Sequence, residues 1–495
     1  MIQRDRRTLF AIAATLTAAL FGPFTVRADL EELPYELALR TDRVELELRD
    51  GRVDVIIDPL AESGLRVNDL LSGEETTGFV LIDEREEGLV IGQPHGGEKV
   101  APRLLVEIVT NDDISVEIRG SGLNVVIDDR REEAPSSDGE HDEEAASRRH
   151  SRSSARGHEQ FLIEVEKSDV VLRRVRGARL EGSDNSAHLE QTTGSVEMAL
   201  ADSSLFVDSH RGRLDLAIQD SDVQIDGAAT RIEVRLTDSQ LSIADGVGEL
   251  EVDATNSDVF LERWQGNAHI SGQMARVDLV ECGAASDRFY LGGTRHELNV
   301  AGYAGALTVV LRDGAVNGQR LHGPANLTLD AGSINLEELH DAVGLRLREG
   351  VQARLEGARR KVDGTLEESR LDLRDVREVN LNMNRAELYA VEMSGKTRIK
   401  ATDSDVEVDL RGNRTRSELI VESGTRARIS MSEPCTVRLE GKLDDLEDQV
   451  LNSGCELAAS DDKRRPTIRA RRGGAPTVLN VRLDEDATLE VSASP

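Results

Sequence analysis

An 18-residue repeat runs without a gap from position 184 to position 273 and constrains the fold more than any other feature of the chain. Five units start at Asp184, Asp202, Asp220, Asp238 and Asn256, and each opens with Asp or Asn followed by Ser or Asn. Positions 4, 6, 13, 15 and 17 of the units are apolar, with Gly272 as the exception. A spacing of two within each apolar group is the period of a β-strand and not of a helix.

The residues between the two apolar groups indicate corners. Position 11 is Gly in four of the five units, at Gly194, Gly212, Gly248 and Gly266, and Gly tolerates the backbone angles of a tight corner. Asp, Asn and Ser at positions 1 and 2 are residues that hydrogen-bond the backbone at turns. Each unit therefore predicts strand, corner, longer strand, corner. This is one coil of a parallel β-solenoid.

A left-handed hexapeptide helix also has 18-residue coils, but it needs an apolar residue at every sixth position. In this chain the residue six before position 13 is mostly polar, so a flattened coil with two sheets fits better. We predict an all-β fold: a single-stranded parallel β-solenoid, or β-helix, with coils of about 18 residues. A small N-terminal β module or cap precedes it.

The pattern also predicts the organisation of the chain. We expect a signal peptide over 1–28, the N-terminal module over 29–102, first solenoid coils over 103–128, a charged loop over 129–158 and the main solenoid over 159–490. Two hairpins are expected in the module, with turns at Asp50-Gly51 and near Gly88. The charged loop is too poor in apolar residues to offset its ordering entropy, so we expect it to be disordered.

The N-terminal residues have the composition of an export signal. "MIQRDRR" is basic, "TLFAIAATLTAALFGPF" is apolar, and "VRA" precedes Asp29 as a small-residue cleavage site. Arg6-Arg7 is also similar to a twin-arginine signal, with an uncleaved anchor as a further alternative. No later apolar run reaches the ~18 residues of a spanning helix. We expect an exported protein of the periplasm, cell surface or extracellular space, without a transmembrane segment after signal removal.

The stretch "RLLVEIVTNDDISVEIRGSGLNVVI", followed by "SDVVL" and "GSVEM" units, resembles a bacterial family of exported parallel β-solenoid domains that carries the name adhesin. The resemblance covers about residues 103–440. It implies an exported, non-catalytic protein of the surface or periplasm. It carries no functional residues over to this chain.

The chain has a formal net charge of −32. Such a surface repels nucleic acid and attracts cations. At outward position 14 the stacked coils predict a column of Glu197, Asp215, Glu233 and Glu251. Like charges stacked so closely need compensation, which either a calcium ion or the flanking arginines 213, 231 and 235 would supply. The acidic column is therefore a candidate metal site, and we expect no other cofactor.

Three aromatic side chains are candidates for a partner surface, and two of the three cysteines are candidates for a disulfide bond. Phe206 and Phe260 occupy outward position 5, and Trp264 lies in a corner. We expect these exposed aromatic side chains to form a partner surface, or to be covered by another part of the chain. Cys435 and Cys455 are separated by close to one repeat and are plausible disulfide partners in an oxidising compartment. Cys282 fits a small buried filler better than a nucleophile.

No Ser-His-Asp, Cys-His, phosphate-loop or zinc signature occurs in the sequence. We therefore expect a non-catalytic binding, adhesion or structural module of the bacterial cell envelope, whose partner is an envelope protein or polysaccharide. The alternative is a β-helical carbohydrate-active enzyme acting on polysaccharide. Acidic and basic residues clustered in a groove away from the regular columns would favour the enzyme. Charges confined to the columns would favour the module.

Overall fold

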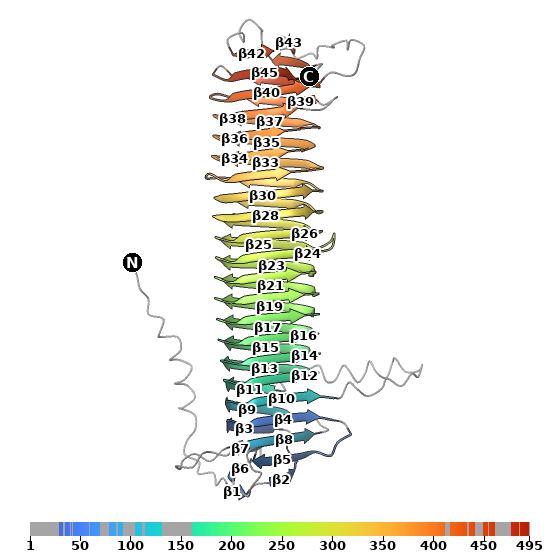
Figure 1. Cartoon of the computed structure of the whole chain (residues 1–495), viewed down its shortest axis with the longest axis vertical. Helices are drawn as coiled ribbons and strands as arrows, with labels where there is room; N and C mark the ends of the chain where they lie inside the picture. The colour runs from blue at the N-terminus through green and yellow to red at the C-terminus, as the bar shows by residue number, and fades with distance from the viewer. Residues whose placement is uncertain are drawn as a thin grey trace, which may run out of the picture. The chain divides into compact units, whose positions relative to one another are not determined.

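The computed structural model describes residues 29–32, 35–39, 41, 43–58, 60–69, 79–85, 88–92, 104–110, 114–130, 161–410, 416–432, 435–440, 449–453, 455–460, 477–484 and 486–494. Every regular element in these ranges is a β-strand (Figure 1). The predicted signal peptide and residues 131–158 of the charged loop lie outside the described residues. The chain forms two compact units, Met1–Asp169 (unit 1) and Val170–Pro495 (unit 2).

The strands of unit 2 alternate between two sheets, except that the consecutive strands β43 and β44 both belong to sheet A. Sheet A holds the strands β13 (Gly177–Ser183), β15 (Thr193–Ala201), β17 (Arg211–Gln219), β19 (Ala229–Thr237), β21 (Val247–Thr255), β23 (Gln265–Gln273), β25 (Arg288–Thr294), β27 (Ala306–Arg312), β29 (Ala325–Leu329), β31 (Val343–Leu347), β33 (Lys361–Glu367), β35 (Glu378–Asn384), β37 (Thr397–Thr402), β39 (Arg416–Val421), β41 (Cys435–Glu440), β43 (Glu456–Ser460) and β44 (Thr477–Leu483).

Sheet B holds the strands that alternate with those of sheet A. Its strands are β14 (Ser186–Glu190), β16 (Ser204–Asp208), β18 (Asp222–Asp226), β20 (Gln240–Ala244), β22 (Asp258–Glu262), β24 (Arg276–Cys282), β26 (Glu297–Tyr303), β28 (Gly314–Leu321), β30 (Gly332–Leu339), β32 (Gln352–Glu356), β34 (Arg370–Arg374), β36 (Glu387–Val391), β38 (Asp405–Leu410), β40 (Arg426–Ser432), β42 (Val450–Ser453) and β45 (Thr488–Ser494). β12 (Asp169–Arg173), at the boundary between the units, also belongs to sheet B.

The 18-residue period is the register of stacking. Leu214 of β17 lies beside Ile232 of β19, which lies beside Leu250 of β21, and all these neighbours are parallel. The apolar positions point between the two sheets and form the core, where Ile232 is fully buried. The predicted parallel β-solenoid, with a flattened coil of two sheets that repeats at this period, is confirmed.

The corners explain the residues at positions 1 and 11. Asp202 and Asp220 both have φ of 50°, in the left-handed region that Asp and Asn tolerate better than other side chains. Gly212 has φ of 137°, and a Cβ atom at this position would lie 2.1 Å from the backbone oxygen of Gly194 in the preceding coil. Position 11 therefore favours Gly both for its backbone angles and for the closeness of the preceding coil.

The serine at position 2 does more than turn the chain. Ser203, Ser221, Ser239 and Ser257 are buried and stack as a serine ladder along one edge of the core. The hydroxyl of Ser221 donates to the carbonyl oxygen of Gln219 at 2.6 Å and accepts from the backbone N–H of Ser203 at 2.8 Å. Each such hydroxyl thus satisfies a buried amide of the preceding coil.

Unit 1 contains strands β1 (Asp29–Glu32), β2 (Tyr35–Ala38), β3 (Arg43–Arg49), β4 (Arg52–Ile57), β5 (Gly64–Asp69), β6 (Phe79–Arg85), β7 (Gly88–Gly92), β8 (Leu104–Thr110), β9 (Ser115–Ser121), β10 (Asn124–Asp129) and β11 (Phe161–Glu166). The hairpin expected near Gly88 is confirmed, because β6 and β7 pair antiparallel. The hairpin expected at Asp50-Gly51 is wrong. There the chain turns a corner from one sheet to the other.

The strands on either side of that corner are inserted between other coils of unit 1. β3 pairs in parallel with β7 and with β9, and β4 pairs in parallel with β8 and with β10. Antiparallel strands then extend both sheets: β6 and β1 follow β7, and β5 and β2 follow β8. The early coil 43–57 therefore lies inside the stack and not at its edge.

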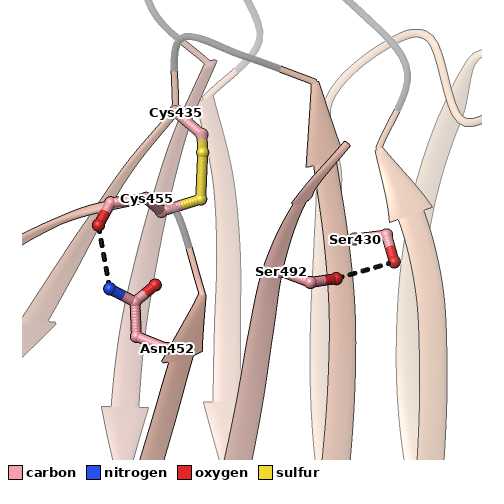
Figure 2. The surroundings of a disulfide bond; sticks show 5 residues. All are labelled: Ser430, Cys435, Asn452, Cys455 and Ser492. Atoms are coloured by element: carbon pink, nitrogen blue, oxygen red, sulfur yellow. Dashed lines mark hydrogen bonds between the residues drawn. A yellow bond between two sulfur atoms is a disulfide. The ribbon is translucent and has the colours of Figure 1, made fainter. Parts of the chain in front are cut away.

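The last coil of unit 2 is inserted in the same way. β44 lies between β39 and β41, and β45 lies between β40 and β42. Figure 2 shows the hydrogen bond between the Ser430 and Ser492 hydroxyls, 3.2 Å apart, which joins β40 to β45. It also shows the disulfide bond between Cys435 and Cys455, with an S–S distance of 2.04 Å. The disulfide joins the start of β41 to the residue preceding β43.

Candidate functional site

The acidic column lies on the outer face of sheet A, where the period predicts it. Glu197 lies beside Asp215, Asp215 beside Glu233, and Glu233 beside Glu251. His269 follows Glu251 in the same column and stacks on Tyr290, with ring centroids 4.5 Å apart. The column therefore brings four carboxylates from four successive coils together and ends on an aromatic pair.

Arginines on the neighbouring outward position compensate the column. Arg213 Nε lies 2.9 Å from an Asp215 oxygen of its own coil, and its Nη2 lies 3.2 Å from Glu233 of the next coil. Arg231 Nε lies 2.8 Å from the other Glu233 oxygen. The hydrogen bond to Asp215 and the adjacent carboxylates raise the pKa of Arg213 above its usual value. The guanidinium groups thus separate the stacked negative charges.

The four carboxylates of the column and Arg213 line a shallow hollow of about 560 Å³, which we call the acidic hollow, together with Arg235, which lies beside Asp253 of the next coil. In the part of the chain that the structure describes, no group of three or more His, Cys, Asp or Glu side chains has the arrangement of a metal site. The calcium site proposed for the acidic column stays a prediction.

Phe206 and Phe260 lie in one column on the outer face of sheet B. The column runs from His188 through Phe206, Gln224 and Ser242 to Phe260, each residue beside the next. Phe206 is half-buried against the edge of the His188 ring, with centroids 4.8 Å apart. Phe260 is 36% exposed. Two aromatic side chains thus bracket two coils that carry polar side chains.

The space between these two phenylalanines is a second hollow, of about 540 Å³. We call it the phenylalanine hollow and define it by Phe206, Gln224, Ser242 and Phe260 with the adjacent outward column of Ser204, Asp222, Gln240 and Asp258. The sequence places both phenylalanines at position 5, but the hollow depends on the polar residues between them. Reading position 5 from coil to coil would have found Gln224 and Ser242.

Trp264 is not part of this surface. Its side chain is 2% exposed and belongs to the core, so its assignment to a partner surface is wrong. The indole packs over Gly246 of the preceding coil, where an added Cβ atom would lie 2.4 Å from the ring. The absence of a side chain at Gly246 creates the space that the indole fills.

The cysteines occupy two environments. Cys435 and Cys455 form the disulfide bond described above. Cys282 is buried, and its single S–H is shared between the carbonyl oxygens of Leu261 and Val280, each 3.3 Å from the sulfur. Burial raises the pKa of the Cys282 thiol, which keeps it protonated and unreactive.

Comparison of the chain with models of protein families, with curated proteins and with solved structures finds no match. Among the residues that the structure describes, no helix has the length and apolar character needed to cross a membrane.

Proposed function

We propose that this chain is an exported, non-catalytic β-solenoid that acts as a binding, adhesion or structural module of the bacterial cell envelope. The observation that carries the proposal is the pairing of charges along the columns of sheet A. Arg213 contacts Asp215 and Glu233, which are regular column positions. A hydrolase or lyase site places its carboxylates and bases in a groove that departs from the repeat, because the two reacting groups need different environments.

Two further features support export. Residues 1–28 have the charge and apolar pattern of a signal peptide. The disulfide between Cys435 and Cys455 is of a kind that persists in oxidising compartments and is rare in the cytosol. A long repeat array suits an envelope module, since stacking produces extended faces with the same side chains repeated from coil to coil.

Export is tested by expressing the full chain with a C-terminal epitope in a bacterial host, followed by fractionation and N-terminal sequencing. We expect a mature protein that starts at Asp29 and is recovered from the periplasm, the surface or the medium. A double substitution, Arg6→Lys with Arg7→Lys, serves as a matched variant: loss of export assigns the twin-arginine route, and unchanged export assigns the general route. Cytoplasmic retention of the uncleaved wild-type chain would contradict export.

The non-catalytic assignment is tested separately with the purified mature chain. We expect no new reducing ends or unsaturated products when it is incubated with neutral and acidic polysaccharides. Product formation that is lost on Asp215→Asn or Glu233→Gln would assign the polysaccharide-acting enzyme instead, since these carboxylates lie in the acidic hollow.

A further inference from the structure

The phenylalanine hollow has the volume of a ligand site and lies along a column of side chains that repeats from coil to coil. Phe206 and Phe260 are separated by the coils of Gln224 and Ser242, so three coil steps lie between them. At ~4.8 Å per step the two aromatic side chains stand about 14 Å apart along the stack. The volume of about 540 Å³ falls in the range of ordinary ligand sites.

The polar lining selects the chemistry of a ligand. Gln224 lies between the phenylalanines, and Asp222, Gln240 and Asp258 follow the adjacent outward column, all of them exposed. They offer amide and carboxylate groups at repeated intervals. No Lys or Arg is among the residues that line the hollow. Asp278, which lines the hollow beyond Phe260, forms an ion pair with Arg276 at 3.1 Å, whereas Asp222 and Asp258 add negative charge to the lining. An acidic ligand is therefore repelled.

We propose that the phenylalanine hollow binds an uncharged linear polysaccharide, laid along the stack of coils. The apolar faces of two pyranose rings pack on Phe206 and Phe260. Hydroxyl groups of the rings between them donate to the carboxylate of Asp222 and exchange hydrogen bonds with Gln224 and Ser242. The proposal rests on the function proposed above and names the chemistry of its partner.

The same lining disfavours the other occupants. The buried core of a protein–protein interface is more apolar than the rest of the surface, whereas here two coils with polar outward side chains separate the aromatic side chains. A second copy of the chain carries the same net charge of −32, and its approach is opposed by repulsion. A polymer that repeats at a spacing close to that of the coils meets equivalent groups on successive coils.

The test measures binding of the mature chain by isothermal titration calorimetry. The probes are uncharged hexasaccharides of glucose, mannose, galactose and N-acetylglucosamine, with polygalacturonate as the acidic comparison and a lysine-rich peptide as the cationic one. We expect at least one uncharged hexasaccharide to bind, with affinity reduced about tenfold or more by Phe206→Ala or Phe260→Ala. Disaccharides of the same sugar, which cannot span both phenylalanines, should bind more weakly.

Tyr389→Ala provides the matched control. Tyr389 occupies the same outward column in β36 and is 39% exposed, but it lies outside the hollow. Its substitution should leave binding unchanged. Phe260→Leu keeps an apolar side chain and removes the aromatic face. Weakened binding by a Phe260→Leu chain that retains the wild-type circular dichroism spectrum excludes misfolding as the cause.

Three outcomes overturn the inference: no uncharged hexasaccharide binds, a hexasaccharide binds with equal affinity to wild type and to Phe260→Ala, or only the lysine-rich peptide binds. None of them bears on whether the chain is exported. Failure of the glycan site and failure of the envelope assignment are therefore distinguishable.

Discussion

Removal of one hydroxyl from the serine ladder should leave a buried backbone N–H of the preceding coil without its hydrogen-bond acceptor. Ser221 is 5% exposed, and its Oγ accepts the backbone N–H of Ser203, itself 8% exposed, at 2.8 Å. The carbonyl of Gln219, to which Ser221 donates, also accepts the N–H of Asp202 at 3.1 Å and so keeps a partner. Ser221→Ala therefore leaves one buried donor, the Ser203 amide, without its acceptor.

An unsatisfied buried donor costs about 1–3 kcal/mol. At about 1.4 kcal/mol for each factor of ten, exchange of the Ser203 amide should accelerate by roughly one to two orders of magnitude. The assay is native-state hydrogen exchange resolved to the Ser203 amide. The measurement is local because long repeat arrays do not unfold in one cooperative step, so a single global stability is not well defined for them.

Ser204→Ala is the matched control, because Ser204 neighbours the ladder in sequence but is exposed. Substitution at such a site changes stability by less than about 0.5 kcal/mol. Equal exchange rates of the Ser203 amide in Ser221→Ala and Ser204→Ala chains would refute the reasoning. Acceleration in the Ser221→Ala chain alone would establish that the ladder joins successive coils.

Three further predictions concern the corners and the ends. Gly212→Ala should destabilise its coil strongly, because the added Cβ atom would lie 2.1 Å from a backbone oxygen. Gly227→Asn should be tolerated, because its left-handed corner leaves 3.6 Å to the nearest atom. Hydrogen exchange of the amides in the substituted coil compares the two variants. Burial lowers the pKa of His210, so the unfolded chain binds more protons than the folded chain below pH about 6.5. The free energy of local opening of β17, measured by hydrogen exchange, should therefore fall as the pH falls from there, and less steeply after His210→Asn. Equal slopes for the two proteins would contradict this role. The double substitution Cys435→Ser with Cys455→Ser should weaken the terminal segment by about 3 kcal/mol, seen as faster hydrogen exchange in β41 with β17 unchanged as the internal control.

Much of the main solenoid could be predicted because stacking in a parallel coil converts sequence separation into spatial contact. A residue lies beside the residue one period away, so the neighbours of Asp215 and of Phe206 follow from the period alone. The alternation of apolar residues likewise determines which side chains enter the core. The acidic column and the alignment of the two phenylalanines are therefore properties of the sequence.

The details of each site needed the tertiary structure. The corner position of Trp264 predicts an exposed side chain. The absence of a side chain at Gly246 instead lets the indole enter the core. Arg213 was one of three candidate partners for the column, and only its geometry shows that it bridges two coils. The hollow between the phenylalanines likewise depends on the sizes of the intervening side chains of Gln224 and Ser242.

The order of coils at both ends was decided by the tertiary structure alone. The coils 43–57 and 477–494 are each inserted between two other coils, and both of those neighbours are distant in the chain from the inserted coil. Their alternating pattern matches that of any other coil. It therefore specifies a strand and its buried face, but it does not specify which strand pairs with it. Backbone hydrogen bonds between parallel strands are the same for every pair. The choice of neighbour therefore depends on side-chain fit across the stack, which a local period does not contain.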